Sequence, residues 1–395
     1  MTHIIKAWSG IATRLPTASL WLTAAALCCA AHTHTAAQTQ RVSVVEYHPA
    51  PGQLVNTLPY YEEGHTHDDM CRACEQQLDD GNLIHLGGWG GYVTVKFDHR
   101  IENKRGSDFR IAGNAYYSDS DPVYGNATIG GSMEPGVVFV GVGDRVEDCR
   151  WYQLAGSEYY TSETHGFRMT YYRPTAESGE HEEPYSTFDK YIRWECSWTD
   201  SDGARRDSTG WLCKNAWHAQ SYWPLWEDGE TMTFTGTRLP DNAVAYDNGN
   251  GGLYWVLYRY ADDAYGYADA AANDEDCSTF DLDWAVDESG EPVSLQHCDF
   301  IRVASGLLQQ CGWIGETSTE VGAFTDLHLI EGYDDNPIVI TQRERPSDTG
   351  CANLHGGAKT VVTRYDMLGH KVGAHAKGLV IEICTDGSAR KRMIR

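Results

Sequence analysis

Basic residues are scarce in this sequence. Lysine and arginine together number 31, against 56 aspartates and glutamates, and the formal net charge is −25. Proteins that bind nucleic acid neutralise phosphates with patches of lysine and arginine, so this composition excludes nucleic acid as an expected partner. The acidic excess favours a well-solvated protein outside the cell that can hold cations.

Long apolar runs are absent beyond the first residues. The run Leu20–Ala31 is too short to span a bilayer, lies after two basic residues and is followed by small residues. These features predict a secretory signal peptide over residues 1–37, cleaved after Ala31 or Ala37. No later run is long enough for a membrane helix, so we expect an exported protein at the cell surface or in the extracellular space.

Familiar catalytic motifs are also missing from the sequence. It contains no G-x-S-x-G elbow, no H-E-x-x-H pair and no glycine-rich phosphate loop between a strand and a helix. We therefore predict a non-catalytic protein. A glycoside hydrolase-like enzyme stays open as an alternative, because its two carboxylates can be far apart in the sequence.

Amphipathic helices are few, and short alternating runs take their place. In Tyr92–Phe97 the apolar residues Val93, Val95 and Phe97 share one face, which is typical of a half-buried strand. Similar runs occur at 137–142, 168–172, 232–234 and 254–258, separated by glycine-rich turns. The pattern predicts an all-β fold, a jelly-roll-like β-sandwich with a short N-terminal helix and a small C-terminal β-domain.

The clearest helix signal covers residues 67–80. Thr66 can cap its start with Asp69 three residues later, and Gly81 can end it. Acidic residues in the first turn also suit the positive end of the helix dipole.

The stretch GHTHDDMCRAC, at the start of this helix, contains two histidines and two cysteines. His67, Cys71, Cys74 and Leu78 fall on one stripe, and His65 lies just before the helix. Imidazole and thiolate are the ligands that zinc and copper prefer, so a metal site is possible. The same stripe must face the core, however, and core packing or disulfide formation is the favoured interpretation.

Twelve cysteines are present, two of them inside the predicted signal peptide, so an even number remains for an oxidising compartment. We predict disulfides between pairs that bracket turn-rich segments or close the terminal domain: Cys196–Cys213, Cys277–Cys298 and Cys351–Cys384. The remaining cysteines are expected to pair among themselves: Cys71, Cys74, Cys149 and Cys311.

A cluster of aromatic residues predicts a ligand-binding face. Flat rings on rigid loops can stack on sugars or other flat ligands. The predicted binding residues follow Trp211 closely: Trp217, His218, Tyr222, Trp223 and Trp226. About half of these rings are expected in the core, because alternate strand positions point inward and tryptophan is usually well buried.

The stretches LIHLGGWGGYVTVKFDHRIEN (83–103), WYQLAGSEYY (151–160) and CGWIGETSTEV (311–321) resemble those of an uncharacterised family of Bacteroidetes cell-surface, adhesion-like proteins. The resemblance covers about residues 48–329. It implies a surface protein. Because relatives occur with cobalamin uptake systems, it also leaves open a protein that captures corrinoids.

Acidic residues within these family-like stretches are candidate ligands for Ca²⁺, a hard cation that exported β-sandwiches bind through carboxylate and carbonyl oxygens. The candidates are Asp108, Asn114, Glu134, Asp281 and Asp283. The alternative is that these side chains cap turns and face solvent.

Residues 359–395 contain the segments YDMLGHKV and KGLVIE and end in a basic tail. These features resemble the C-terminal sorting domain of type IX secretion. The resemblance implies export through the type IX machinery.

These observations divide the chain into a signal peptide (1–37), a β-sandwich domain (38–330), a linker (331–357) and a sorting-like β-domain (358–395). The expected function is non-catalytic binding of an extracellular glycan or other surface ligand, with a surface protein or a corrinoid as alternative partners. Ca²⁺ is the candidate cofactor, and no cofactor is certain from the sequence.

Overall fold

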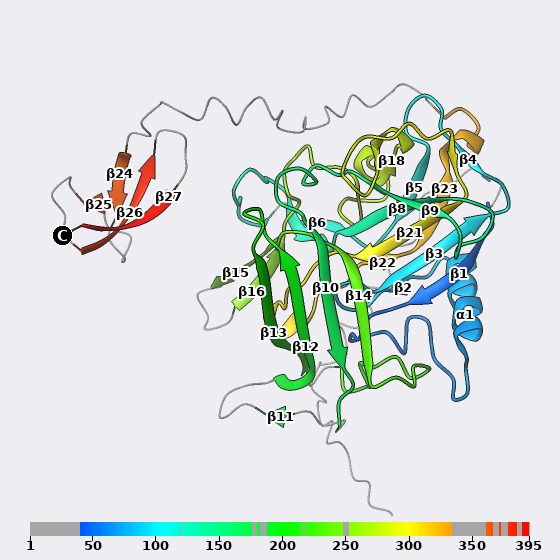
Figure 1. Ribbon diagram of the computed structural model, residues 1–395, viewed down its shortest axis with the longest axis horizontal. Helices are drawn as coiled ribbons and strands as arrows, with labels where there is room; N and C mark the ends of the chain where they lie inside the picture. Colours follow the sequence, from blue (N-terminus) through cyan, green and yellow to red (C-terminus); the bar gives the residue numbers. More distant parts are fainter. Residues whose placement is uncertain are drawn as a thin grey trace, which may run out of the picture.

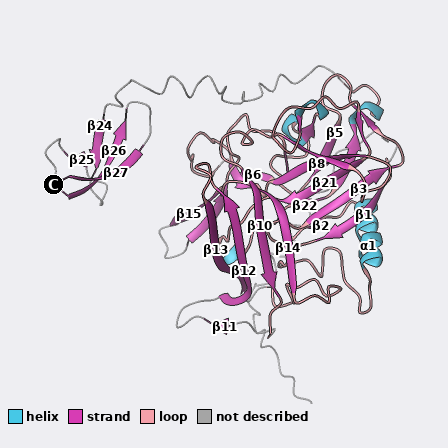
Figure 2. Ribbon diagram, viewed as in Figure 1, coloured by secondary structure: helices cyan, strands magenta, loops and turns pink. Residues whose placement is uncertain are grey.

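Antiparallel strands make up most of the regular structure of this protein. The computed structural model describes residues 40–118, 120–175, 180–181, 188–215, 218–247, 253–333, 361–365, 371–372, 378–384 and 389–394. Every strand pairing in these residues is antiparallel, which confirms the expected all-β class (Figures 1 and 2). No helix in these ranges is both long and apolar enough to cross a membrane.

The largest sheet carries the first core. Its order is β1 (Val42–His48), β3 (Tyr92–Phe97), β21 (Phe300–Ser305), β8 (Gly136–Val142), β9 (Arg150–Leu154) and β19 (Ala285–Val286), with β17 (Tyr267–Ala268) paired to β8. As the alternation in β3 predicts, Val93, Val95 and Phe97 are buried in this core.

A second sheet carries a separate core (Figure 1). Its order is β11 (Glu180–His181), β12 (Phe188–Thr199), β10 (Thr164–Tyr172) and β14 (Thr231–Arg238), with β13 (Arg205–Asn215) paired to β12. The core residues of this sheet pack against Ala50 and Trp89, which lie in segments next to the first sheet. Gly87 lets the two segments that contain Ala50 and Trp89 approach each other closely, because a Cβ there would lie 1.9 Å from the carbonyl oxygen of Ala50.

Shorter ladders close the remaining edges. They are β18 (Thr279–Phe280) with β5 (Phe109–Ala112) and β23 (Ala323–Asp326), β2 (Ile84–His85) with β22 (Glu320–Val321), β20 (His297–Cys298) with β4 (Ile101–Glu102), β15 (Ala243–Asp247) with β16 (Leu253–Leu257), and β6 (Tyr116–Ser118) with β7 (Gly130–Ser132). The short 3₁₀ helices are η1 (Asp276–Ser278), η2 (Leu282–Trp284), η3 (Gly312–Ile314) and η4 (Leu327–Leu329). Near the C-terminus, β25 (Lys371–Val372), β24 (Val361–Tyr365), β26 (Gly378–Cys384) and β27 (Ala389–Ile394) form a sheet of their own.

The predicted helix is present as α1 (His67–Asp79). Thr66 accepts a hydrogen bond from the backbone N–H of Asp69, and the Asp69 carboxylate accepts one from the backbone N–H of Thr66. This capping box confirms the predicted start of the helix. The helix buries Met70 and Cys74 in the first core.

The predicted disulfides Cys196–Cys213 and Cys277–Cys298 are wrong. In the β12–β13 hairpin Cys196 lies opposite Ser208, whereas Cys213 lies opposite Lys190. Six residues of strand separate these positions, roughly 20 Å, which is far beyond the reach of a disulfide. The cause is a tight turn at residues 200–204, so that most of the predicted insertion is strand.

The other expected pairings also fail within the described residues. Cys277 and Cys298 are free thiols, as are the four cysteines for which no partner was assigned: Cys71, Cys74, Cys149 and Cys311. Cys277 donates a hydrogen bond to Glu275, and burial raises the pKa of the Cys298 thiol. Cys351 lies outside the described residues, and so does the predicted Cys351–Cys384 pair.

We expect alkylation of the denatured, unreduced protein to modify Cys196, Cys277 and Cys298. The reason is that the strand register and the free thiols leave these side chains without a disulfide partner. Mass spectrometry of proteolytic peptides measures the modification. A peptide that joins Cys196 to Cys213 would contradict the β12–β13 register.

Candidate ligand-binding pocket

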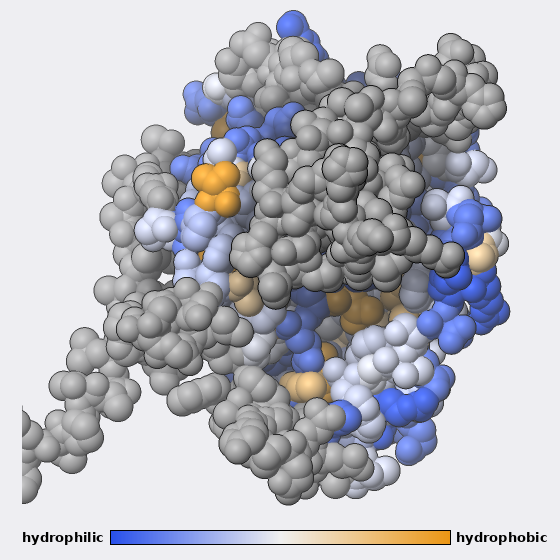
Figure 3. Space-filling model, turned by 90° about the vertical axis from the view of Figure 1, so that its left-hand side faces the viewer, coloured by the Kyte–Doolittle hydropathy of each residue, from blue (hydrophilic) through white to orange (hydrophobic). Residues whose placement is uncertain are grey.

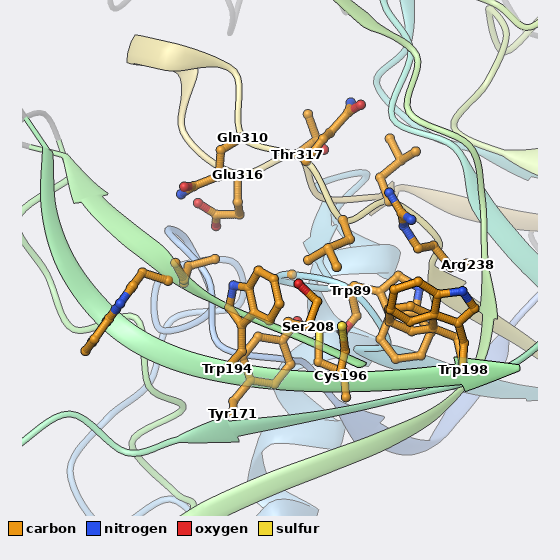
Figure 4. Close-up of a pocket in the computed structure, with 18 residues that line it drawn as sticks. Trp89, Tyr171, Trp194, Cys196, Trp198, Ser208, Arg238, Gln310, Glu316 and Thr317 are labelled. Atoms are coloured by element: carbon orange, nitrogen blue, oxygen red, sulfur yellow. Dashed lines mark hydrogen bonds between the residues drawn. The ribbon is translucent and has the colours of Figure 1, made fainter. Parts of the chain in front are cut away.

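A pocket of about 350 Å³ lies between the second sheet and the segment 307–317 (Figure 4). This volume is at the lower end of the range for small-molecule sites. Figure 3 views the molecule from the side of β13 and β15 and shows a recess with an apolar base among mostly hydrophilic surroundings. The aromatic lining of the pocket comprises Trp89, Phe167, Tyr171, Trp194, Trp198 and Trp211.

Alternation along β12 places the accessible rings. Trp194, Cys196 and Trp198 are two residues apart, so they share one face of the strand, and all three line the pocket. Trp194 pairs with Gly210 of β13, where a Cβ would lie 2.2 Å from the indole. Gly210 therefore makes room for the Trp194 ring, which is half-buried.

The aromatic rings at the base of the pocket pack against one another, and two of them form hydrogen bonds with backbone carbonyl groups. Phe167 stacks against Trp198 with ring centroids 5.6 Å apart and contacts Trp89 edge-on at 4.7 Å. Tyr171 donates its hydroxyl to the carbonyl of Trp89, and the Trp89 indole donates to the carbonyl of Thr237. These rings can therefore offer apolar faces without leaving a polar group unpaired.

Three polar atoms of residues that line the pocket lack partners. Glu316 Oε2, Thr317 Oγ1 and Arg238 Nε are buried and have no hydrogen-bond partner within the described part of the chain. All three residues line the pocket, and Figure 4 shows Glu316 and Gln310 across the cavity from Trp194. Burial raises the pKa of Glu316 to about 8. Buried polar groups are normally paired, so these three atoms are exceptions within the pocket wall.

A cluster of carboxyl groups lies near Glu316. Oxygen atoms of Glu134, Asp269 and Glu320 all lie within 4.8 Å of one another. Burial, together with the charge of Asp269, raises the pKa of Glu134 to about 8. Glu134 and Glu320 share a side-chain hydrogen bond, which requires that one of them is protonated, and Glu320 Oε2 is buried without a partner.

Asp269 is held in this cluster by backbone groups. Its carboxylate accepts hydrogen bonds from the N–H groups of Asn114, Ala115 and Glu320 at 2.7, 2.8 and 3.0 Å. These bonds favour the ionised form, but burial outweighs them and raises the pKa of Asp269 to about 7.

His85 does not neutralise the cluster. Its Nε2 lies 3.2 Å from Glu320 Oε1, while its Nδ1 accepts a hydrogen bond from the N–H of Gly87. Burial is the largest cause that lowers the pKa of His85 to about 3, so the ring is neutral and acts as a hydrogen-bond donor rather than an ion-pair partner. The cluster therefore carries uncompensated negative charge when its carboxyls ionise.

The predicted aromatic binding face is wrong for three of its members. Tyr222 and Trp223 are 0% and 1% exposed and pack in the second core, where they cannot reach a ligand. Trp226 packs against Tyr47 in the first core. His218 is half-buried, and Trp217 lies outside the described residues.

Rings that line the pocket come instead from the segment WECSW, Trp194 to Trp198, and from Trp211. Trp194 and Trp198 are four positions apart, and side chains an even number of positions apart lie on the same face of a strand. That spacing was the sequence signal for this pocket.

The predicted calcium ligands do not converge on one site. Asp108 accepts hydrogen bonds from the N–H groups of Lys104 and Leu282 and lies 3.0 Å from His328 Nε2. Asp281 accepts one from the N–H of Asp283, and Asp283 is exposed. For these acids the turn-capping alternative is the better interpretation.

The other two predicted ligands lie at the carboxylate cluster. Glu134 belongs to it, and Asn114 contributes a backbone N–H to Asp269 rather than a side-chain oxygen. Asp269 and Glu320 were not among the predicted ligands, because their contact with Glu134 forms only when distant segments of the chain pack together.

Known protein-family models and curated proteins were compared with this chain, and none matches.

Proposed function

We propose that this protein is an exported, non-catalytic surface protein that binds a carbohydrate in the aromatic pocket. The observation that carries the proposal is the group of half-buried indoles that line the pocket, with the polar side chains of Gln310 and Glu316 across the cavity. Sugar rings present apolar C–H faces together with hydroxyls, and both kinds of group would find a complement here.

The lining of the pocket supports binding rather than hydrolysis. A glycoside hydrolase needs two carboxyl groups on either side of the scissile bond. Glu316 is the one carboxyl-bearing residue among those that line this pocket. The alternative of a glycoside hydrolase-like enzyme therefore receives less support.

The size of the pocket favours a sugar unit over a corrinoid. A corrinoid macrocycle with its nucleotide loop is much larger than a cavity of about 350 Å³. Corrinoid capture and contact with a surface protein stay secondary candidates for this chain.

Export to the cell surface is part of the proposal. It rests on the apolar N-terminal run, on the resemblance to cell-surface proteins and on the likeness of residues 359–395 to a type IX sorting domain. The jelly-roll-like arrangement of the β-sandwich also belongs to the proposal, and the uniformly antiparallel pairing supports it.

We further propose that the carboxylate cluster binds Ca²⁺. Several carboxyl oxygens converge there, and Glu320 Oε2 is buried without a partner. Ca²⁺ takes oxygen ligands and would compensate the charge that His85 leaves uncompensated.

A glycan array followed by calorimetry tests the binding function. We expect the protein to retain one class of glycan, and Trp198→Ala to weaken binding by about tenfold or more, because a ring that stacks on the ligand is lost. Tyr116→Ala is the matched control, since Tyr116 is 61% exposed and lies outside the pocket.

Tight binding of cobalamin, seen as an absorbance shift, with no glycan retained would contradict this proposal and favour the corrinoid alternative. Equal loss of binding in Trp198→Ala and Tyr116→Ala would show that the aromatic pocket is not the site.

A further inference from the structure

A second group of metal-ligating side chains lies away from both the pocket and the carboxylate cluster. It consists of His48, His67 and Glu227, whose donor atoms all lie within 4.8 Å of one another. His48 is the last residue of β1, His67 is the first residue of α1, and Glu227 lies in the turn before β14. Three segments that are distant in the sequence therefore meet at one point.

The distances suit a small cation. Glu227 Oε1 lies 3.2 Å from His67 Nε2 and 4.0 Å from His48 Nδ1. Ligands of tetrahedral Zn²⁺ with bonds near 2.1 Å are about 3.4 Å apart. Small side-chain movements would therefore bring all three donors onto one ion.

Each ligand is held by packing or hydrogen bonds. The capping box at Thr66 sets the first turn of α1, and with it His67. The ring of His48 packs against Tyr92 with centroids 5.2 Å apart. The carbonyl of Glu227 accepts hydrogen bonds from Arg173 and from the Trp223 indole at 3.1 and 3.3 Å.

The two nitrogens of the His67 ring have different surroundings. Nδ1 of His67 is buried without a hydrogen-bond partner in the described residues. Glu227 lies 3.2 Å from the other ring nitrogen, Nε2, so a metal at this site would bind Nε2 and leave Nδ1 outside the coordination.

The rest of the GHTHDDMCRAC stretch does not join this group. His65 lies against Tyr61 and Glu62, and Cys74 is buried in the first core. Burial raises the pKa of the Cys71 thiol to about 11, which disfavours the thiolate needed for coordination. The histidines and cysteines that lie close together in the sequence therefore do not form one site. His67 instead lies next to His48 and Glu227, which come from distant parts of the sequence.

We propose that His48, His67 and Glu227 form a Zn²⁺ site with an open coordination position. Two imidazoles and one carboxylate are a ligand set that zinc favours, and three protein ligands leave a fourth position for water or an external anionic group. The two imidazoles distinguish this site from the all-oxygen carboxylate cluster, which suits Ca²⁺. The site is independent of the carbohydrate-binding function proposed above.

The proposal is tested on purified, tag-free protein that has been stripped of metal. We expect isothermal titration with Zn²⁺ to show one tight site, and His67→Ala and Glu227→Gln to weaken it by about a hundredfold or more, because a direct ligand is lost. His65→Ala is the matched control, since its imidazole is nearby but lies outside the group. Zn²⁺ should bind with unchanged affinity in the presence of excess Ca²⁺.

A spectroscopic readout separates coordination from an effect on folding. Co²⁺ in place of Zn²⁺ should give the intense visible absorption of a four-coordinate ion in the wild type and in His65→Ala, but not in Glu227→Gln. Circular dichroism checks that each variant is folded. If the wild-type protein binds no more Zn²⁺ than His67→Ala, then His67 and Glu227 interact only with each other and the proposal is wrong. If His65→Ala loses Zn²⁺ binding, then the metal does not lie at His48, His67 and Glu227.

Discussion

In the presence of a chelator, the free energy of unfolding is expected to fall by about 4 kcal/mol as the pH rises from 6.5 to 8.5. The cause is the group of buried carboxyls whose pKa values in the folded state are about 7 for Asp269 and about 8 for Glu134 and Glu316. In the unfolded chain these groups are already ionised above pH 5. Up to the raised pKa values, the folded state keeps protons that the unfolded chain has already lost, so the free energy of unfolding falls as the pH rises.

The choice of pH range separates this effect from that of His85. Because the pKa of His85 is lowered to about 3 in the folded state, this residue adds stability as the pH rises toward the unfolded value near 6.5. That contribution has the opposite sign, and it is complete at about pH 6.5. Above this pH the carboxyl groups dominate the change.

Ca²⁺ should reverse the loss of stability. A cation bound by the ionised cluster stabilises the folded state by mass action, so unfolding in urea at pH 8.5 should require more denaturant with Ca²⁺ than with chelator. Glu320→Gln removes one charge and should both flatten the pH dependence and abolish the effect of Ca²⁺. Glu63→Gln, an exposed acid, is the matched control. A stability that increases from pH 6.5 to 8.5 in chelator would contradict the raised carboxyl pKa values.

Substitution of Trp194 by alanine should weaken carbohydrate binding by about 30-fold, the effect expected when a central aromatic contact is lost. The Trp194 ring lines the pocket from β12 and is half-buried, so the loss of stability should be modest. Calorimetry with the glycan identified on the array measures the affinity.

Gly210→Ala provides a sharper test, because it keeps every aromatic side chain. The added Cβ would lie 2.2 Å from the Trp194 indole, so the ring must move away from its position. We expect binding to weaken in the same direction as in Trp194→Ala, by about tenfold or more. Wild-type affinity in Gly210→Ala would show that the position of this ring does not matter for binding.

Local signals predicted the elements they control. The capping box of Thr66 and Asp69 correctly placed the start of α1, because its hydrogen bonds lie within one helical turn. The alternation of Val93, Val95 and Phe97 correctly predicted β3 and its buried face. In both cases the interactions lie within a few residues of one another.

Pairing between strands was not predictable in the same way. The β12–β13 register depends on where the hairpin turns, and the turn at residues 200–204 is tighter than the polar composition of this segment implied. A change in the turn position moves every cross-strand neighbour, which is why Cys196 faces Ser208.

The sequence by itself determined the all-β class, the helix at 67–79 and the main strands, because periodicity and capping are local. Only the tertiary structure decided which aromatic rings line a pocket. Trp223 and Trp194 both occur in aromatic-rich segments, but Trp223 is buried in the core and Trp194 lines the pocket. It also decided that Glu134 meets Glu320 and that His67 meets Glu227. Such groups form where separate segments of the chain pack together, and contacts between distant segments cannot be predicted from residue spacing.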